Sequence, residues 1–110
     1  MEISENSRDG VLVISASGRL DSSSAGALEA VLPARTKDRP AVVLNLADVP
    51  YVSSAGLRVL LIGAKAAKAA GNKLVITGLS PAVREVFDIS GFSKILTIEA
   101  DVDAAVAAIG

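Results

Sequence analysis

The 110-residue sequence contains no cysteine and no histidine, and these two absences exclude several kinds of functional site. A chain without cysteine has no disulfide and no thiolate nucleophile, and without histidine it also has no Cys/His zinc site. A Ser-His-Asp triad and a histidine general base are excluded as well. The G-x-S-x-G signature of serine hydrolases and the G-x-x-x-x-G-K-[ST] phosphate loop are both missing. We therefore expect a protein that is not an enzyme and that carries neither a cofactor nor a metal.

Charge and long hydrophobic runs are also scarce. The formal net charge is −1 and no long run of one sign occurs, so the basic footprint of a nucleic-acid-binding protein is missing. No apolar run reaches the roughly 18 residues of a membrane span, and the polar, acidic start is unlike a signal peptide. We expect a cytoplasmic protein that binds no nucleic acid and does not insert into a membrane.

The sequence is rich in aliphatic residues, and its expected strands and helices alternate along the chain. Apolar residues make up 51% of the chain and aromatics only 3%, a composition typical of α/β folds whose strands are buried on both faces. Strands are expected near residues 2–4 and over 11–17, 41–46, 73–79 and 94–100. Helices are expected to begin near residues 25, 55, 81 and 102. This order predicts one α/β domain over residues 1–110, with a mostly parallel mixed sheet of about five strands, an antiparallel N-terminal edge and four helices packed on it.

Turn and cap residues set most of the expected boundaries. Asp9-Gly10 suits a hairpin turn, Pro33 should end or kink the first helix, and residues 36–40 read as a turn. Ser80-Pro81 is a typical helix start. The expected helix stops are Gly71 and Gly91, and Asp101 is expected to cap the last helix.

The segment YVSSAGLRVLL, residues 51–61, places Ser53 and Ser54 between a buried strand and a helix. One interpretation is a helix N-cap, which contributes about 1 kcal/mol. The other is a modification site, because a helix N-terminus has free N–H donors and a partial positive charge. A phosphate there would be tolerated by the fold and would add about −1.5 to −2 charges. Local sequence alone leaves both interpretations open.

The helix that follows these serines has two distinct faces at 100° per residue. Leu57, Leu60, Leu61 and Ala64 share a face that should pack on the sheet. The opposite side carries Arg58 and Lys65 beside an aliphatic strip of Ala55, Val59, Ile62 and Ala66. That strip is either a tolerated feature of an alanine-rich helix or a partner-docking face.

Asp21 ends the second strand. The carboxyl ends of parallel strands form one rim, where sites tend to lie, so Asp21 and Ser54 are expected on the same rim. Alternatively, Asp21 only favours the N-terminus of the next helix.

Three segments, GRLDSSSAGALEAVL, VVLNLADVPYVSSAGLRVLL and ITGLSPAVREVFDISGFSKIL, together resemble the STAS domain, and in particular the small bacterial anti-sigma factor antagonists. The resemblance extends from about Ile3 to Ile109. It implies a binding module, a monomer when alone. A cognate anti-sigma factor, itself a serine kinase, would bind the unphosphorylated module, phosphorylate it and release it. A PP2C-type phosphatase would reverse the modification, and the exchange would free a sigma factor or another target.

The resemblance also implies which residues form the site. In the family motif Asp-Ser-(Ser/Thr)-Gly-Leu the first serine accepts the phosphate, so Ser54 is the expected acceptor and Ser53 the second choice. Ser53 stands where the family has Asp, which is the departure of this sequence from the motif. The Asp of the family's Gly-x-Leu-Asp turn corresponds to Asp21. The expected partner-binding residues are Asp21, Ser22, Ser23, Ser53, Ser54, Ala55, Gly56, Arg58, Val59, Ile62 and Lys65.

A second function is compatible with the same resemblance. The chain could be an accessory subunit of a lipid-transport ABC system, or part of a signalling scaffold, that docks on a partner without an obligatory phosphorylation switch. Neighbouring genes distinguish the two: a kinase and a phosphatase favour the first function, a permease and an ATPase the second.

Overall fold

A single five-stranded sheet in the order β1-β2-β3-β4-β5 forms the centre of the computed structural model, which describes residues 1–109. The strands are β1 (Glu2–Arg8), β2 (Val11–Ser17), β3 (Ala41–Asp48), β4 (Lys73–Thr77) and β5 (Thr97–Glu99). β1 pairs antiparallel with β2, and all other neighbours are parallel. The predicted mixed sheet with an antiparallel N-terminal edge is confirmed.

The predicted turn and helix ends are also confirmed at several positions. Asp9 and Gly10 have φ of 53° and 82°, the left-handed conformation that a tight hairpin turn requires of both central residues. α3 (Ser54–Ala70) ends at Gly71, and α4 (Pro81–Ser90) follows the cap Ser80, whose Oγ accepts from the N–H of Val83 at 3.2 Å. Asp101 accepts from the N–H of Ala104 at 2.8 Å at the start of α5 (Val102–Ile109).

The first predicted helix, expected to end or kink at Pro33, is shorter than predicted: α1 covers only Ala25–Glu29, and a separate helix, α2 (Leu32–Asp38), follows it. Pro33 lies in the first turn of α2, where the missing N–H of proline costs nothing. Residues 36–38, predicted as part of a turn, belong to α2. Thr36 is fully buried there, and its hydroxyl donates to the carbonyl of Pro33 at 2.9 Å.

The last strand is shorter than predicted. Phe92–Lys94 form a 3-10 helix, and only Thr97–Glu99 join the sheet, whereas the prediction ran over residues 94–100. β5 therefore pairs only with Val75, Ile76 and Thr77 of β4.

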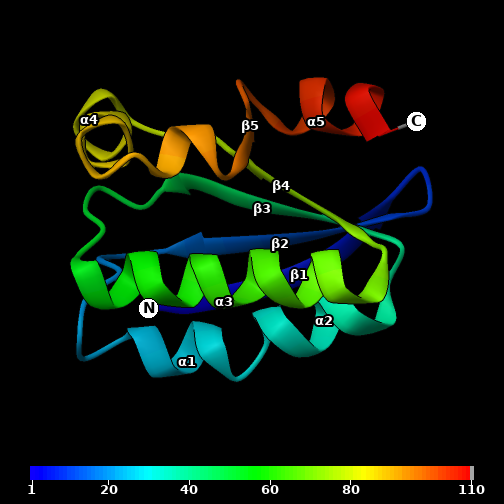
Figure 1. Cartoon of the computed structure of the whole chain (residues 1–110), viewed down its shortest axis with the longest axis horizontal. Coiled ribbons are helices and arrows are strands. Elements are labelled where there is room, and N and C mark those ends of the chain that lie inside the picture. The colour runs from blue at the N-terminus through cyan, green and yellow to red at the C-terminus, as the bar shows by residue number, and fades with distance from the viewer. Residues whose placement is uncertain (110) are drawn as a thin grey trace.

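Helices cover the two faces of the sheet unequally, as Figure 1 shows: α1, α2 and α3 lie on one face and α5 on the other. The larger core contains Ile14, Leu44 and Ile76 of the sheet together with Leu28, Leu32 and Leu60 of the helices, and Phe87 of α4. The smaller core joins Val13, Val43 and Val75 to Ala105 of α5. Alternate strand residues thus supply the two cores.

Helix α3 packs on two surfaces at once. One side of it faces the sheet, and another lies along α1 and α2 (Figure 1). At Gly63 the approach is so close that a Cβ would stand 2.7 Å from Cδ2 of Leu32. Because two surfaces cover it, α3 buries a wider arc than a helix packed on the sheet alone.

Candidate partner-binding site at the head of helix α3

Two loops at the carboxyl end of the strands are joined by an isolated parallel bridge between Leu20 and Val52. The N–H of Leu20 donates to the carbonyl of Tyr51 at 2.9 Å, and the N–H of Ser53 donates to the carbonyl of Leu20 at 2.8 Å. Leu20 and Val52 are buried. Their neighbours along the extended chain therefore point the opposite way, toward solvent. The bridge thus brings Asp21 and Ser53, which are distant in the sequence, to the same rim.

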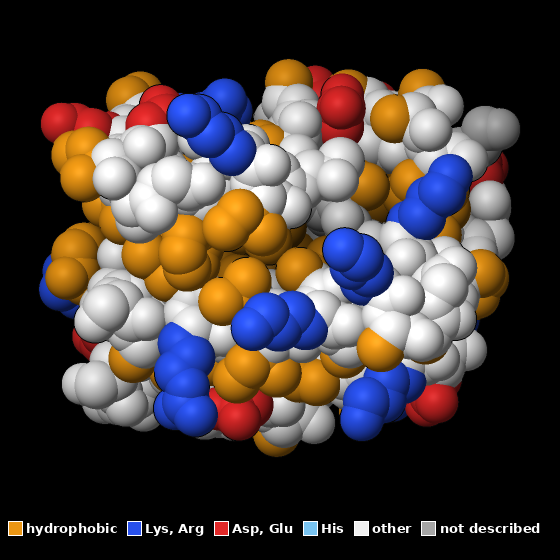
Figure 2. All heavy atoms as spheres, viewed as in Figure 1, with side chains coloured by type: hydrophobic (Ala, Val, Ile, Leu, Met, Phe, Trp, Pro, Cys, Tyr) orange, Lys and Arg blue, Asp and Glu red, His pale blue; other side chains and the backbone are white. Residues whose placement is uncertain are grey.

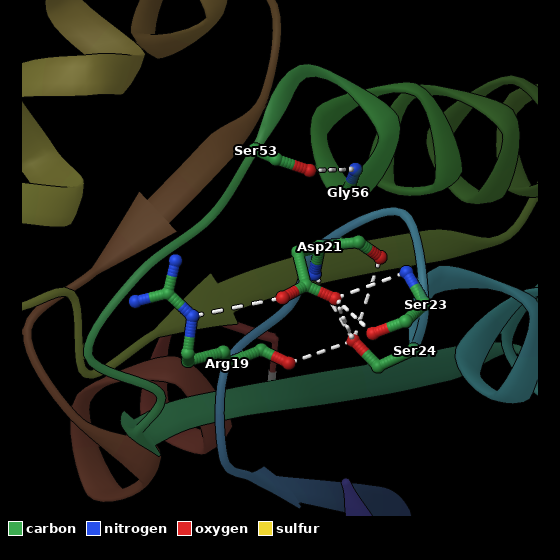
Figure 3. Close-up of polar contacts among 6 residues, drawn as sticks. All are labelled: Arg19, Asp21, Ser23, Ser24, Ser53 and Gly56. Carbon is green, nitrogen blue, oxygen red and sulfur yellow. Dashed lines mark hydrogen bonds and ion pairs between the residues drawn. The ribbon is translucent and has the colours of Figure 1, made fainter.

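Asp21 is fixed by the turn that it begins (Figure 3). Its Oδ1 accepts from the backbone N–H of Ser23 at 3.0 Å and from the hydroxyl of Ser23 at 2.7 Å. Ser24 completes the turn, since its hydroxyl donates to the carbonyl of Arg19 at 2.7 Å and accepts from the N–H of Asp21 at 3.0 Å. The carboxylate thus orders its own turn, and Ser24, the N-cap residue of α1, makes no side-chain cap bond.

The same contacts keep Asp21 ionised. The hydrogen bonds donated by the hydroxyl and the N–H of Ser23 lower the pKa of the Asp21 carboxyl, because they stabilise the charged form. Arg19 places its Nε 3.6 Å from Oδ2 of the same carboxylate. The rim therefore carries a fixed negative charge beside a guanidinium.

Arg19 and Tyr51 form a second contact at this rim, and neither residue was among the predicted site residues. The guanidinium carbon of Arg19 lies 4.3 Å from the centre of the Tyr51 ring, a cation–π arrangement. In the sequence, Arg19-Leu20-Asp21 and Tyr51-Val52-Ser53 each place an apolar residue between two outward-facing ones. This alternation is the signal that could have indicated a short strand-like pairing of the two loops.

The two adjacent serines have different environments. Ser53 is the N-cap of α3, half-buried, with its Oγ accepting from the N–H of Gly56 at 3.4 Å (Figure 3). Ser54 is the first residue of the helix and is exposed, and within residues 1–109 its hydroxyl makes no hydrogen bond. The capping role therefore belongs to Ser53, and the hydroxyl of Ser54 stands free at the helix N-terminus.

Gly56 allows the head of α3 to approach the bridge. A Cβ at this position would lie 2.7 Å from Cγ of Leu20 and 2.9 Å from the carbonyl oxygen of Leu20. No real side chain fits at such distances, so only glycine lets the helix start directly above Leu20. Gly56, predicted as a partner-binding residue, is buried, so it supports the head of the helix and presents little surface to a partner.

Less of the aliphatic strip on α3 is accessible to a partner than the sequence predicted. Val59 is only 2% exposed, so it cannot form part of a docking surface, and the reason is that α1 and α2 cover that side of α3. Ile62, Ala55 and Ala66 are half-buried, whereas Arg58 and Lys65 are exposed. Leu61 and Ala64, predicted to face the sheet, are also only half-buried.

The remaining predicted residues lie at the rim. Ser22 and Ser23 are exposed at the tip of the Asp21 turn. Figure 2 shows the side of the molecule on which α3 lies, where Lys and Arg side chains alternate with apolar patches. The accessible members of the predicted set are therefore Asp21, Ser22, Ser23, Ser53, Ser54, Ala55, Arg58, Ile62 and Lys65.

The fold and this rim define a small α/β domain with two adjacent serines at the carboxyl edge of its sheet, of which Ser53 caps α3 and Ser54 is exposed. The chain belongs to the STAS domain family, whose model matches residues 2–105. It is 42% identical over 109 residues to a protein of Bordetella bronchiseptica named "Putative anti-sigma factor antagonist BtrV", covering 98% of this chain and 94% of BtrV.

Solved structures give the same fold. The crystal structure of an anti-sigma factor antagonist from Mycobacterium paratuberculosis matches with a TM-score of 0.88 at 28% identity, covering 98% of this chain and 92% of the other. The Bacillus cell fate determinant SpoIIAA, solved in its phosphorylated form, matches with a TM-score of 0.74 at 18% identity, over 99% of this chain and all of SpoIIAA.

Within residues 1–109, no group of His, Cys, Asp or Glu side chains is placed to hold a metal ion. In the same part of the chain, every helix is too short or too polar to cross a membrane.

Proposed function

We propose that this chain is an anti-sigma factor antagonist whose binding is controlled by phosphorylation of Ser54. The unphosphorylated chain binds a cognate anti-sigma factor that is also a serine kinase, and this releases a sigma factor or another target. The partner contacts the Asp21 turn and the exposed cationic side of α3. The chain itself is a binding module and performs no catalysis. Its relatives named anti-sigma factor antagonists support this role.

The observation that carries the proposal is the contrast between Ser53 and Ser54. The Ser53 hydroxyl accepts from the N–H of Gly56, so a phosphate on it would disturb the cap of α3. The exposed hydroxyl of Ser54 can enter a kinase active site without breaking any contact of the fold. Its position in the first turn of a 17-residue helix also suits an added anion.

Phosphorylation would control binding through the charge that it adds to the rim. The kinase transfers the γ-phosphoryl group of ATP to Oγ of Ser54, the hydroxyl proton leaves, and ADP is released. About −1.5 to −2 charges are then added to a rim that already carries the ionised Asp21. A partner surface complementary to the unmodified rim must now accept a bulky dianion, so the complex dissociates. A PP2C-type phosphatase restores the serine by hydrolysis.

A binding experiment tests the proposal. Wild type, Ser54→Ala and Ser54→Asp are used to capture the partner from a lysate of the source organism, and the captured kinase is then purified for titration. We expect wild type and Ser54→Ala to bind, and Ser54→Asp to lose the complex. Equal binding of all three variants would instead favour a docking module without a phosphorylation switch.

A further inference from the structure

A groove of about 440 Å³ lies at the end of the sheet away from the Asp21 rim, where β4 begins. Apolar walls come from α3, β4, α5 and the segment before β5, which are distant in the sequence. Ala64 of α3, Leu74 of β4, Ile95 before β5, and Ala108 and Ile109 of α5 all line it. Its volume lies within the range typical of small-ligand sites.

The groove exists because the edge of the sheet is incomplete there. β5 begins at Thr97, opposite Val75, so Lys73 and Leu74 have no strand neighbour on that side. Three of the lining side chains are alanines, Ala64, Ala67 and Ala108, whose methyl groups are too small to fill the gap. Ile95 remains 62% exposed at this place. An exposed isoleucine beside an apolar hollow favours a ligand that removes both from water.

The charged side chains that line the groove are both cations. Lys68 comes from α3 on one face of the sheet, and Lys73 begins β4; among the described residues, no acidic side chain lines the groove. Asn72 also lines it, but its amide already donates to the carbonyls of Thr36 and Lys37 at 2.9 and 3.1 Å. Figure 2 shows apolar side chains in a hollow in the right half of the view, with Lys and Arg side chains beside it.

We propose that this groove binds a medium-chain aliphatic carboxylate. The hydrocarbon tail would pack on Leu74, Ile95 and Ile109, and the carboxylate would lie between the ammonium groups of Lys68 and Lys73. The site goes beyond the phosphorylation switch and is separate from it. Ser54 and Lys68 are 14 residues apart on one helix, about 21 Å along its axis.

Titration with sodium octanoate, followed by methyl-detected NMR of the full chain, tests the proposal. Octanoate should shift the methyl signals of Ile95, Ile109 and Leu74 saturably at millimolar concentration. Two probes separate the roles of tail and charge: acetate has the carboxylate without the tail, and octyltrimethylammonium has the tail with the opposite charge. Neither should bind at the concentration at which octanoate saturates.

Variants with matched controls complete the test. The double variant Lys68→Ala/Lys73→Ala should weaken octanoate binding roughly tenfold, whereas Lys65→Ala, on the same helix but outside the groove, should not. Ala108→Leu should block the groove, whereas Ala107→Leu, exposed on the same helix, should leave binding unchanged. The proposal is overturned if octanoate gives no saturable shifts, if the cation binds equally well, or if each variant behaves like its control. None of these outcomes concerns Ser54, so the phosphorylation switch stands or falls separately.

Discussion

Leu20 and Val52 pair as an isolated parallel β-bridge, and their backbone hydrogen bonds of 2.9 and 2.8 Å hold the Asp21 turn against the head of α3. Both side chains are buried, so the bridge is anchored in the larger core. Two segments separated by 31 intervening residues thereby form one rim. Partner binding at this rim requires that the bridge present Asp21, Ser53 and Ser54 together.

Replacement of Gly56 by alanine should loosen this arrangement. The new Cβ would stand 2.9 Å from the carbonyl oxygen of Leu20, which belongs to the backbone of the bridge and cannot move cheaply. We expect Gly56→Ala to lower the free energy of unfolding by about 1–3 kcal/mol, measured by urea denaturation. The control is Gly26→Ala in α1, where a Cβ would meet nothing within 4 Å. The control should be neutral or slightly stabilising, and an equally harmless Gly56→Ala would contradict the close approach.

The two serines should differ in their effect on stability. Ser53→Ala removes the N-cap of α3 and should cost about 0.5–1 kcal/mol, at the lower end of the range for caps because its Oγ is 3.4 Å from the N–H of Gly56. Ser54→Ala removes a hydroxyl that bonds to nothing within residues 1–109 and should leave the unfolding free energy unchanged. Urea denaturation of both variants provides the measurement. A larger loss with Ser54→Ala would reverse the assignment of the cap.

Acid should weaken the rim through Asp21. The pKa of its carboxyl is lowered in the folded chain from an ordinary value of 3.8. Its contribution to stability is therefore present above about pH 3.8 and disappears as the pH falls through the lower, folded pKa. In Asp21→Asn the group no longer titrates, although the amide oxygen can still accept from Ser23. We expect the unfolding free energy of wild type to fall more steeply than that of Asp21→Asn as the pH drops below about 4. Parallel curves would show that the Ser23 contacts do not stabilise the carboxylate.

Much of the fold could be predicted because its signals are local. The Asp9-Gly10 turn, the Ser80-Pro81 helix start and the glycine stop at Gly71 each depend on the conformation of one or two residues. The order of strands and helices then predicted the mixed sheet with its antiparallel edge. Asp21 and Ser54 were predicted to share a rim, because the carboxyl ends of parallel strands lie together.

The predictions that were wrong concern features that tertiary contacts determine and the local sequence does not. A helical wheel assigns Val59 to a flank of α3, but only the fold reveals that α1 and α2 cover that flank. Proline at position 33 could end one helix or begin another, and burial of Thr36 selects the second outcome. The Leu20–Val52 bridge joins two short loops, and no periodicity develops over three residues.

Charge reversal on α3 should weaken partner binding without harming the fold. Arg58 and Lys65 are exposed on α3, a helix with three cations and no acidic residue. Arg58→Glu and Lys65→Glu should each weaken binding of the purified partner about fivefold or more, mainly through slower association at low salt. Lys37→Glu, exposed on α2, is the control and should bind like wild type. If the control weakens binding as much as the two α3 variants, net charge rather than this face governs the interaction.

Mapping the phosphate tests the central claim most directly. The purified cognate kinase and ATP are incubated with wild type, Ser53→Ala and Ser54→Ala, and the products are mapped by mass spectrometry. The account predicts one phosphate on wild type and on Ser53→Ala, located at Ser54, and none on Ser54→Ala. Modification of Ser53, or of any residue other than Ser54, in the wild-type chain would contradict it.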